Sequence, residues 1–272
     1  MKLSSRLLRR IIIAGIFLAV FSLTGLGLKK VITPVSSCTD GIMNGEEEGV
    51  DCGAIACGKE CEPDLGPPQV ISTKLIKTGG LDYDFVAEIL NPHKDFGASE
   101  VSYELTLFNQ EGEELLRQEG VFYLLPEQTK FVILPFLTTE NNVGDIDLKI
   151  KSAKWQKLES LEGMNFLVRR EKYTKSDGSS HLEAVVINDS DFDFQIVDID
   201  IILLNSDEEI IAVYKTDVRK LLARTERHFV ATWPFTIGDK VDKTEFRIST
   251  NLFYDLNYLK RYGSGIEQFQ QY

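Results

Sequence analysis

From residue 70 onward, apolar and polar residues alternate along the chain in short runs. In VSYELTLFN the apolar residues occupy every second position: Val101, Tyr103, Leu105 and Leu107. A period of two places alternate side chains on one face of a strand, so the run predicts a strand with one buried face. Runs of this kind, separated by polar turns, predict an all-β fold.

The pattern occurs twice. VSYELTLFN, beginning at Val101, aligns with VDIDIILLN, beginning at Val197, and FVAEILN, ending at Asn91, aligns with LEAVVIN, ending at Asn188. Three further pairs follow in the same order: Leu124-Leu125 with Leu221-Leu222, Pro135-Phe136 with Pro234-Phe235, and DLKIKS with EFRIST. The matched segments occur in the same order and are separated by nearly the same number of residues, which predicts two copies of one domain.

The repeat also decides an ambiguous segment. DVRKLLARTERH, residues 217–228, taken alone has the pattern of an amphipathic helix. Its counterpart GVFYLLPEQTKF contains a proline in mid-run and β-favouring residues, which disfavour a helix. Because two copies of one fold should agree, we expect strand–turn–strand in both.

The length of each copy and the spacing of its turns predict two tandem Ig-like β-sandwiches, over residues 70–155 and 156–257. Neither contains a cysteine, so antibody-type domains are excluded. The motif order resembles bacterial FxLYD-type domains, a branch of Ig-like folds, and the naming motif falls on residues 105–109 and 201–205. The resemblance covers most of residues 70–255 and implies β-sandwiches of envelope proteins, usually without catalysis.

Near the amino terminus the pattern is different, because residues 11–28 contain no charged side chain. A helix over this run would be about 27 Å long, close to the ~30 Å core of a bilayer. More basic residues precede the run (Lys2, Arg6, Arg9, Arg10) than follow it (Lys29, Lys30). This predicts a single transmembrane helix with residues 1–10 in the cytoplasm and the bulk of the chain extracytoplasmic, with the bilayer as a partner of residues 11–28.

Two alternatives to this anchor remain open. A cleaved signal peptide would need a small-x-small site directly after the run, where the two lysines stand. A lipoprotein is the second, because Val35-Ser36-Ser37-Cys38 is similar to a lipobox. Acylation of Cys38 would leave an odd number of cysteines in an exported protein.

All four cysteines lie within residues 38–61: Cys38, Cys52, Cys57 and Cys61. An exterior location favours disulfides over a tetrathiolate zinc site, whose C-x2-C pairs are missing here. The segment has so few apolar side chains that covalent closure must hold it, and four cysteines allow three pairings. C-x-DGI-x-NG-x-E-x-x-VDCG resembles a small cysteine motif of exported bacterial surface proteins, which implies a disulfide-bonded surface module.

Charge excludes one class of partner. The net charge is −12, although residues 1–30 carry six basic residues and no acidic one. A polyanion has no general attraction for nucleic acid, so we expect no nucleic-acid binding. Residues 62–69 contain three prolines, two of them consecutive, and form a stiff linker. Residues 258–272 form a polar tail.

Oxygen ligands gather around the cysteines, as a hard cation prefers. The calcium candidates are Asp40, Asn44, Glu46, Glu48 and Asp51. Their spacing is not that of an EF-hand, and the alternative is a solvated acidic turn. Calcium is therefore a possible cofactor of this module, and no other cofactor is expected.

Catalytic chemistry finds little support. The three histidines are scattered, at His93, His181 and His228, and no G-x-S-x-G, phosphate-binding glycine loop or H-E-x-x-H occurs. Ser179 and Ser180 beside His181 do not form a triad by adjacency alone, since a base needs an orienting acid in space. Asn188-Asp189-Ser190 is formally a glycosylation sequon. We expect a protein that is not an enzyme.

These patterns predict a single-pass, membrane-anchored, extracytoplasmic protein. It would present two Ig-like domains for protein–protein interaction or assembly at the cell envelope, with an unknown envelope protein as partner. The alternative is a ligand- or calcium-binding receptor or sensor. Because ten cytoplasmic residues cannot hold a signalling domain, such a sensor would act through a membrane partner.

Overall fold

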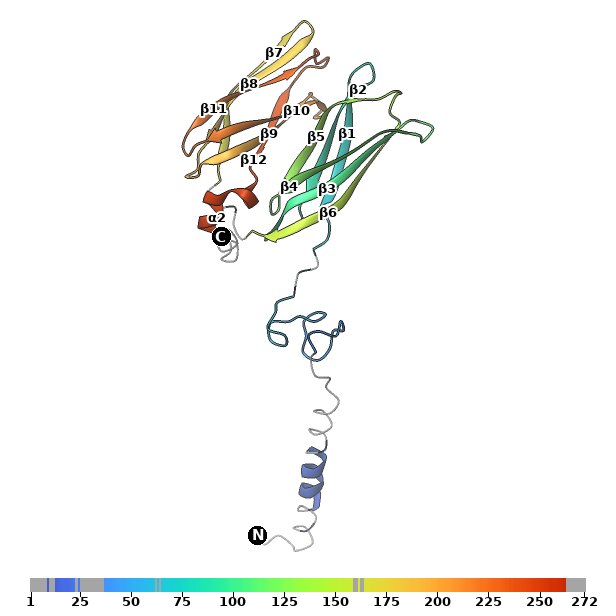
Figure 1. Cartoon of the computed structure of the whole chain (residues 1–272), viewed down its shortest axis with the longest axis vertical. Coiled ribbons are helices and arrows are strands. Elements are labelled where there is room, and N and C mark those ends of the chain that lie inside the picture. The colour runs from blue at the N-terminus through green and yellow to red at the C-terminus, as the bar shows by residue number, and fades with distance from the viewer. Residues whose placement is uncertain are drawn as a thin grey trace, which may run out of the picture. The chain divides into compact units, whose positions relative to one another are not determined.

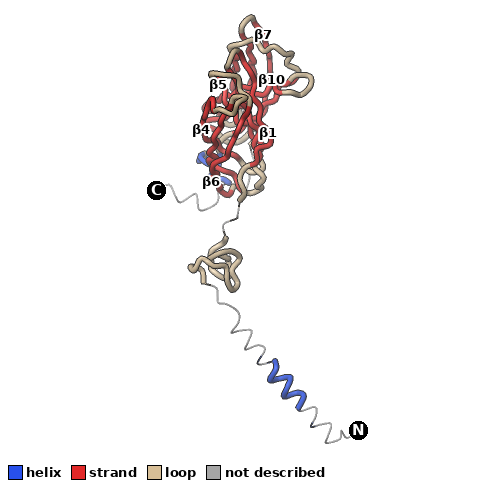
Figure 2. Tube along the Cα trace, turned by 90° about the vertical axis from the view of Figure 1, so that its right-hand side faces the viewer, coloured by secondary structure: helices blue, strands red, loops and turns tan. Residues whose placement is uncertain are grey.

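The structure is a computed structural model that describes residues 9, 13–22, 24, 37–61, 63, 65–158, 161 and 164–262. The chain divides into two compact units, Met1–Asp64 and Leu65–Tyr272. Figure 1 shows both, and in Figure 2 the strands of the described residues all belong to the second, while the disulfide-bonded segment of the first is drawn as loop. The domain boundaries drawn from the sequence stay predictions.

The expected transmembrane helix over residues 11–28 is wrong. Within the part of this run that the structure describes, residues 13–22 and residue 24 are helical. No helix in the described part of the chain is long and apolar enough to cross a membrane. The predicted localisation, a single-pass cell-membrane protein with an extracytoplasmic bulk, depended on this helix and is corrected with it.

An uncharged run of residues indicates a membrane span only where about 20 consecutive residues form one helix. Most other residues of the run, including residues 25–28, lie outside the described part. Residues 29–36, which contain the first half of the lipobox-like sequence, also lie outside it.

Two disulfides organise residues 37–61 and confirm that the cysteines are oxidised. Cys38 is bonded to Cys57 and Cys52 to Cys61, which selects one of the three possible pairings. The larger apolar side chains of the segment are 57% to 86% exposed: Ile42, Met43, Val50 and Ile55. Covalent bonds and turns, and not an apolar core, therefore hold this segment.

The unit Leu65–Tyr272 is built from antiparallel strands. The first repeat contains β1 (Gln69–Gly79), β2 (Asp82–Leu90), β3 (Phe96–Phe108), β4 (Glu114–Leu124), β5 (Thr129–Thr138) and β6 (Asp145–Lys157). The second repeat contains β7 (Phe166–Ser176), β8 (Ser179–Asn188), β9 (Phe194–Leu204), β10 (Ile210–Leu221), β11 (Glu226–Trp233) and β12 (Lys243–Ser249). A 3-10 helix, η1 (Leu252–Tyr254), and a short helix, α2 (Leu256–Tyr262), follow.

Strand pairing repeats with a shift of six strands. The first repeat forms sheets of order β1-β2-β5 and β4-β3-β6, and the second forms β7-β8-β11 and β10-β9-β12. All neighbouring strands are antiparallel. The all-β expectation is confirmed. The strand–turn–strand prediction for residues 217–228 is also confirmed, since they run from the end of β10 through a turn into β11.

Three apolar cores separate the four sheets. One lies between the two sheets of the first repeat, with Phe85 and Leu105 fully buried. A second lies between the two sheets of the second repeat, with Trp233 and Ile199 buried. The third joins sheet β1-β2-β5 to sheet β10-β9-β12. These two sheets are therefore covered on both faces, and they are the surfaces through which the repeats pack.

Corresponding asparagines hold the same corner in each repeat. Asn91 and Asn188 are both fully buried, and Nδ2 of Asn91 donates to the carbonyl oxygens of Phe96 and Leu125. The acceptors of the Asn188 amide are the carbonyl groups of Phe192, Leu221 and Leu222. This burial leaves the Asn188 amide inaccessible to a glycan in the folded chain, although the sequon is formally present.

Candidate functional site at the junction of the two repeats

The repeats meet through six buried apolar side chains. The first repeat contributes Val86, Phe131 and Ile133, and the second contributes Ile202, Leu204 and Val213. Val86 is on β2, Phe131 and Ile133 are on β5, and their counterparts are on β9 and β10. Burying this apolar area stabilises the association of the repeats, at roughly 25 cal/mol per Å².

A polar cluster adjoins this apolar contact and includes a buried lysine. Lys130, on β5, is 2% exposed, and its Nζ donates to Oγ of Ser249 at 3.0 Å. The same Nζ lies 4.0 Å from Oδ2 of Asp198 and 4.0 Å from the ring centroid of Tyr123. A buried ammonium is costly unless paired, so these contacts, two of them with the second repeat, explain how Lys130 is accommodated.

Tyr123, at the end of β4, connects the two repeats through its hydroxyl. It donates to Oδ2 of Asp198 at 2.8 Å, and its oxygen lies 2.8 Å from Oγ of Ser249. Burial, followed by the negative charge of Asp198, raises the pKa of Tyr123, so the phenol stays protonated and remains a donor. Tyr123 and Lys130 of the first repeat thus converge on Asp198 and Ser249 of the second.

Asp200, two residues after Asp198 on β9, differs from Asp198 in its hydrogen bonding. It is 1% exposed, and neither carboxylate oxygen has a hydrogen-bond partner within the described chain. Burial raises the pKa of Asp200 to about 6, while the positive charges of Lys130 and Lys215 oppose the shift. Burial also lowers the pKa of Lys130, with Asp200 and Asp198 opposing that change.

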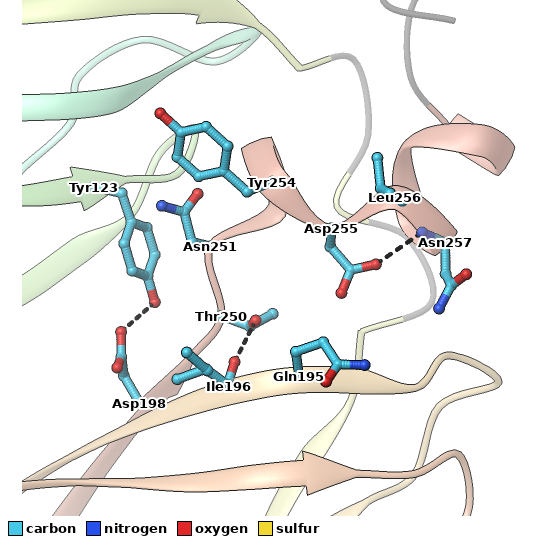
Figure 3. A pocket seen from close by; sticks show the side chains of 10 residues that line it. All are labelled: Tyr123, Gln195, Ile196, Asp198, Thr250, Asn251, Tyr254, Asp255, Leu256 and Asn257. Atoms are coloured by element: carbon cyan, nitrogen blue, oxygen red, sulfur yellow. Dashed lines mark hydrogen bonds between the residues drawn. The ribbon is translucent and has the colours of Figure 1, made fainter. Parts of the chain in front are cut away.

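A groove opens beside this cluster, with a volume of about 620 Å³ (Figure 3). Its lining residues are Tyr123, Gln195, Ile196, Asp198, Thr250, Asn251, Tyr254, Asp255, Leu256 and Asn257. Tyr123 belongs to the first repeat, while the others come from β9 and from the segment that leads through η1 into α2. The groove is therefore composite, because both repeats contribute to its wall.

Local hydrogen bonds fix the segment that forms most of the groove. Thr250 Oγ1 donates to the carbonyl of Ile196 at 2.7 Å. Oδ1 of Asp255 accepts the backbone N–H groups of Asn257 and Tyr258 at 3.1 and 3.0 Å, which caps the start of α2. Tyr258 is fully buried in the core of the second repeat. It lies in the part of the predicted polar tail that the structure describes, and residues 263–272 lie outside that part.

The groove surface combines exposed apolar groups with acid. Ile196, Tyr254 and Leu256 are 51%, 69% and 47% exposed. The charged residues among those that line the groove are Asp198 and Asp255. Large apolar side chains gathered at one hollow are typical of binding surfaces.

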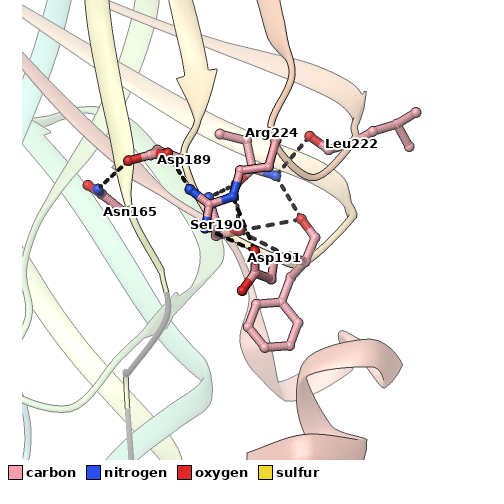
Figure 4. A network of polar contacts seen from close by, with 8 residues as sticks. Asn165, Asp189, Ser190, Asp191, Leu222 and Arg224 are labelled. Carbon is pink, nitrogen blue, oxygen red and sulfur yellow. Dashed lines mark hydrogen bonds and ion pairs between the residues drawn. The ribbon is translucent and has the colours of Figure 1, made fainter.

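A second polar site, at the corner between β8 and β9, is saturated by its own contacts. Arg224 forms ion pairs with Asp189 and with Asp191, the latter at 2.9 Å, and Nδ2 of Asn165 donates to Asp189 (Figure 4). Ser190, between the two acids, bonds to Oδ1 of the buried Asn188. The network stabilises this corner, and its charged groups pair with one another.

In the disulfide-bonded segment, two of the proposed calcium ligands, Asp40 and Asp51, accept hydrogen bonds. Oδ1 and Oδ2 of Asp51 accept the backbone N–H groups of Asp40 and Gly41 at 3.0 and 2.8 Å. Oδ2 of Asp40 accepts from Nδ2 of Asn44 at 2.8 Å. The structure thus brings Asp40, Asn44 and Asp51 together, and their oxygens close the turns.

The other two candidates, Glu46 and Glu48, are exposed. The group of potential ligands that does converge among the described residues is Cys38, Glu47 and Cys57, whose sulfurs are joined in a disulfide. Calcium binding by Asp40, Asn44, Glu46, Glu48 and Asp51 stays a prediction.

His181 contacts two hydroxyl groups. Its Nε2 lies 3.0 Å from Oγ of Ser179 and its Nδ1 lies 3.1 Å from Oγ1 of Thr232. A serine nucleophile needs a histidine that a carboxylate orients, and here a threonine takes that place. The absence of enzymatic activity stays a prediction, as does the absence of nucleic-acid binding.

Comparisons with known proteins add little. No family model matches the chain, and no curated protein matches it. Among solved structures it is similar to red sea bream transglutaminase, with a TM-score of 0.25 and 9% sequence identity over 72% of this chain and 30% of that one. The chain spans less than a third of that protein, and so low a TM-score carries no argument about fold or activity.

Proposed function

We propose that this chain is a non-catalytic protein-interaction module whose two β repeats act together as one binding unit. The partner docks at the composite groove between β9 and the segment that leads into α2. The observation that carries this proposal is that both repeats line the groove. Tyr123 comes from the first repeat, and the remaining lining residues come from the second.

Two properties of the groove support a binding role. Ligand sites occur preferentially where domains meet, because surfaces from two elements can converge there. Exposed tyrosine is also enriched at the energetic centres of protein interfaces, and Tyr254 is 69% exposed. The buried contact between the repeats keeps Tyr123 and Asp198 together, so the groove persists without a partner.

The test is a titration with a purified partner. A protein retained by the full chain would be identified, purified and titrated against the native chain and Tyr254→Ala with both disulfides intact. We expect Tyr254→Ala to raise the Kd about tenfold or more, as loss of an aromatic anchor does. Val230→Ala is the matched control, because Val230 is 43% exposed on β11 and does not line the groove.

Equal affinity of the purified partner for the native chain, Tyr254→Ala and Val230→Ala would contradict the proposal. A loss of affinity that is as large in Val230→Ala as in Tyr254→Ala would contradict it as well, because it would move the interface to the outer sheet of the second repeat.

A further inference from the structure

We infer that the composite groove receives a cationic side chain, arginine or lysine, from an extended segment of the partner protein, with an apolar residue beside it. This inference rests on the proposed function and specifies its partner. It follows from the charge, the uncommitted polar atoms and the exposed apolar groups of the groove.

The charge of the lining has one sign. Among the described residues, Asp198 and Asp255 line the groove and no basic residue does. Lys130 is the cation that contacts Asp198, but it is 2% exposed and donates to Ser249, so it does not reach the groove surface. The chain as a whole carries −12, which adds a long-range attraction for a cationic partner.

Each of the two aspartates has one oxygen in use and one available. The contacts of Asp198 with Tyr123 and Lys130 fall on Oδ2. Those of Asp255 with the backbone of Asn257 and Tyr258 fall on Oδ1. Within the described chain, the other oxygen of each carboxylate has no hydrogen-bond partner, and both side chains lie at the groove in Figure 3. A guanidinium or ammonium group is the donor that suits such acceptors.

Uncharged polar groups at the groove suit a peptide backbone. Gln195 and Asn257 are exposed, and their side-chain amides make no hydrogen bond within the described chain. Oδ1 of Asn251 accepts the N–H of Phe253, while its Nδ2 stays available. Amides both donate and accept, so they can pair with the N–H and C=O groups of an extended segment.

The apolar side chains supply the rest of the contact. Ile196 and Leu256 can pack against the methylene groups of arginine or lysine and against a neighbouring apolar residue. The ring of Tyr254, 69% exposed, is a suitable face for a cation. A segment that combines positive charge with an apolar residue therefore matches all three kinds of group in the groove.

The probe is a pair of peptides that differ at one side chain: acetyl-Gly-Leu-Arg-Leu-Gly-amide and the same peptide with citrulline, a neutral analogue of nearly the same shape, in place of arginine. Each is titrated into the full oxidised chain while the methyl NMR signals of Ile196 and Leu256 are followed. We expect the arginine peptide to shift both signals and to bind about tenfold more tightly than the citrulline peptide. Added salt should weaken the arginine peptide selectively.

Conservative variants locate the charge. Asp198→Asn keeps an oxygen for the Tyr123 hydroxyl, and Asp255→Asn keeps a side chain that caps α2. Each should weaken the arginine peptide about fivefold or more and leave the citrulline peptide unchanged. Asp177→Asn is the matched control, because Asp177 is exposed in the β7–β8 turn and does not line the groove.

Equal binding of the two peptides, or unchanged affinity in both Asp198→Asn and Asp255→Asn, would overturn the inference. So would spermidine binding as tightly as the arginine peptide, since the groove would then recognise small polyamines. If these results occur while Tyr254→Ala still weakens the purified partner, the cationic inference fails and the proposed function stands. If the arginine peptide binds as expected while Tyr254→Ala leaves the partner unaffected, the proposed function fails instead.

Discussion

At the scale of the residue, Asp200 makes the stability of the repeat junction depend on pH. Its pKa is about 6 in the folded chain against an ordinary value of 3.8, and burial is the largest cause. The folded chain thus binds the proton more tightly than the unfolded chain does. The stabilisation from this proton is fully present below about pH 4 and is lost as the pH rises through about 6.

Replacing Asp200 by asparagine should therefore stabilise the chain at neutral pH. The raised pKa already includes the attraction of Lys130 and Lys215, so the neutral side chain is the favoured one. We expect Asp200→Asn to raise the free energy of unfolding at pH 7 by on the order of 1–3 kcal/mol, with a smaller gain at pH 5. Urea unfolding of variant and native chain at both pH values measures this.

Asp198→Asn is the control, because Asp198 accepts a hydrogen bond from Tyr123 and no comparable gain is expected there. A loss of stability in Asp200→Asn at pH 7, or a gain that stays constant down to pH 5, would contradict the account of this residue.

At the scale of the element, the alternating apolar residues of the core-facing side were enough to predict the strands. They were not enough to predict what packs against the opposite side of each strand. Val197, Ile199 and Ile201 on β9 share their periodicity with Val101, Tyr103 and Leu105 on β3, and all six are buried. The opposite faces differ, with Ser102, Glu104 and Thr106 in one copy and Asp198, Asp200 and Ile202 in the other.

The two copies differ on this opposite face of β3 and β9. Glu104 on β3 forms ion pairs with Arg117 and Lys151, whereas Ile202 on β9 packs against the first repeat. Towards the end of VDIDIILLN, apolar residues lie on both faces of the strand. This pattern indicates that β9 is buried on both of its faces. Lys130 and the groove had no such local signal, because their partners are far away in the sequence.

In the disulfide-bonded segment, one glycine makes room for a bridge. A Cβ added at Gly49 would lie 2.8 Å from Sγ of Cys52 and 2.9 Å from Sγ of Cys61, closer than ordinary contacts. Gly49→Ala should therefore prevent the Cys52–Cys61 bond and leave Cys38–Cys57 in place. Mass spectrometry after alkylation without reduction should find two modified cysteines in the variant and none in the native chain.

Gly66→Ala is the control for this substitution, since nothing lies within 4 Å of a Cβ added at Gly66. If Gly49→Ala retained both disulfides, with no cysteine open to alkylation, the close packing around Gly49 would be refuted as a requirement for the bond.

At the scale of the whole molecule, the proposed binding role requires the two repeats of the unit Leu65–Tyr272 to act together. Buried apolar residues from both repeats meet at the junction, and Lys130 and Tyr123 bond to side chains of the second repeat. The groove lies where this junction reaches the surface, because Tyr123 and Asp198 take part in both. A partner held in the groove would thus contact both repeats at once.

The most direct test of this claim is hydrogen–deuterium exchange of the full oxidised chain with and without its purified partner. We predict slower backbone exchange on binding in residues 195–198 and 250–257, together with the end of β4 around Tyr123. Protection confined to the outer sheet β7-β8-β11, or to the disulfide-bonded segment 37–61, would contradict the claim that the partner binds where the two repeats meet.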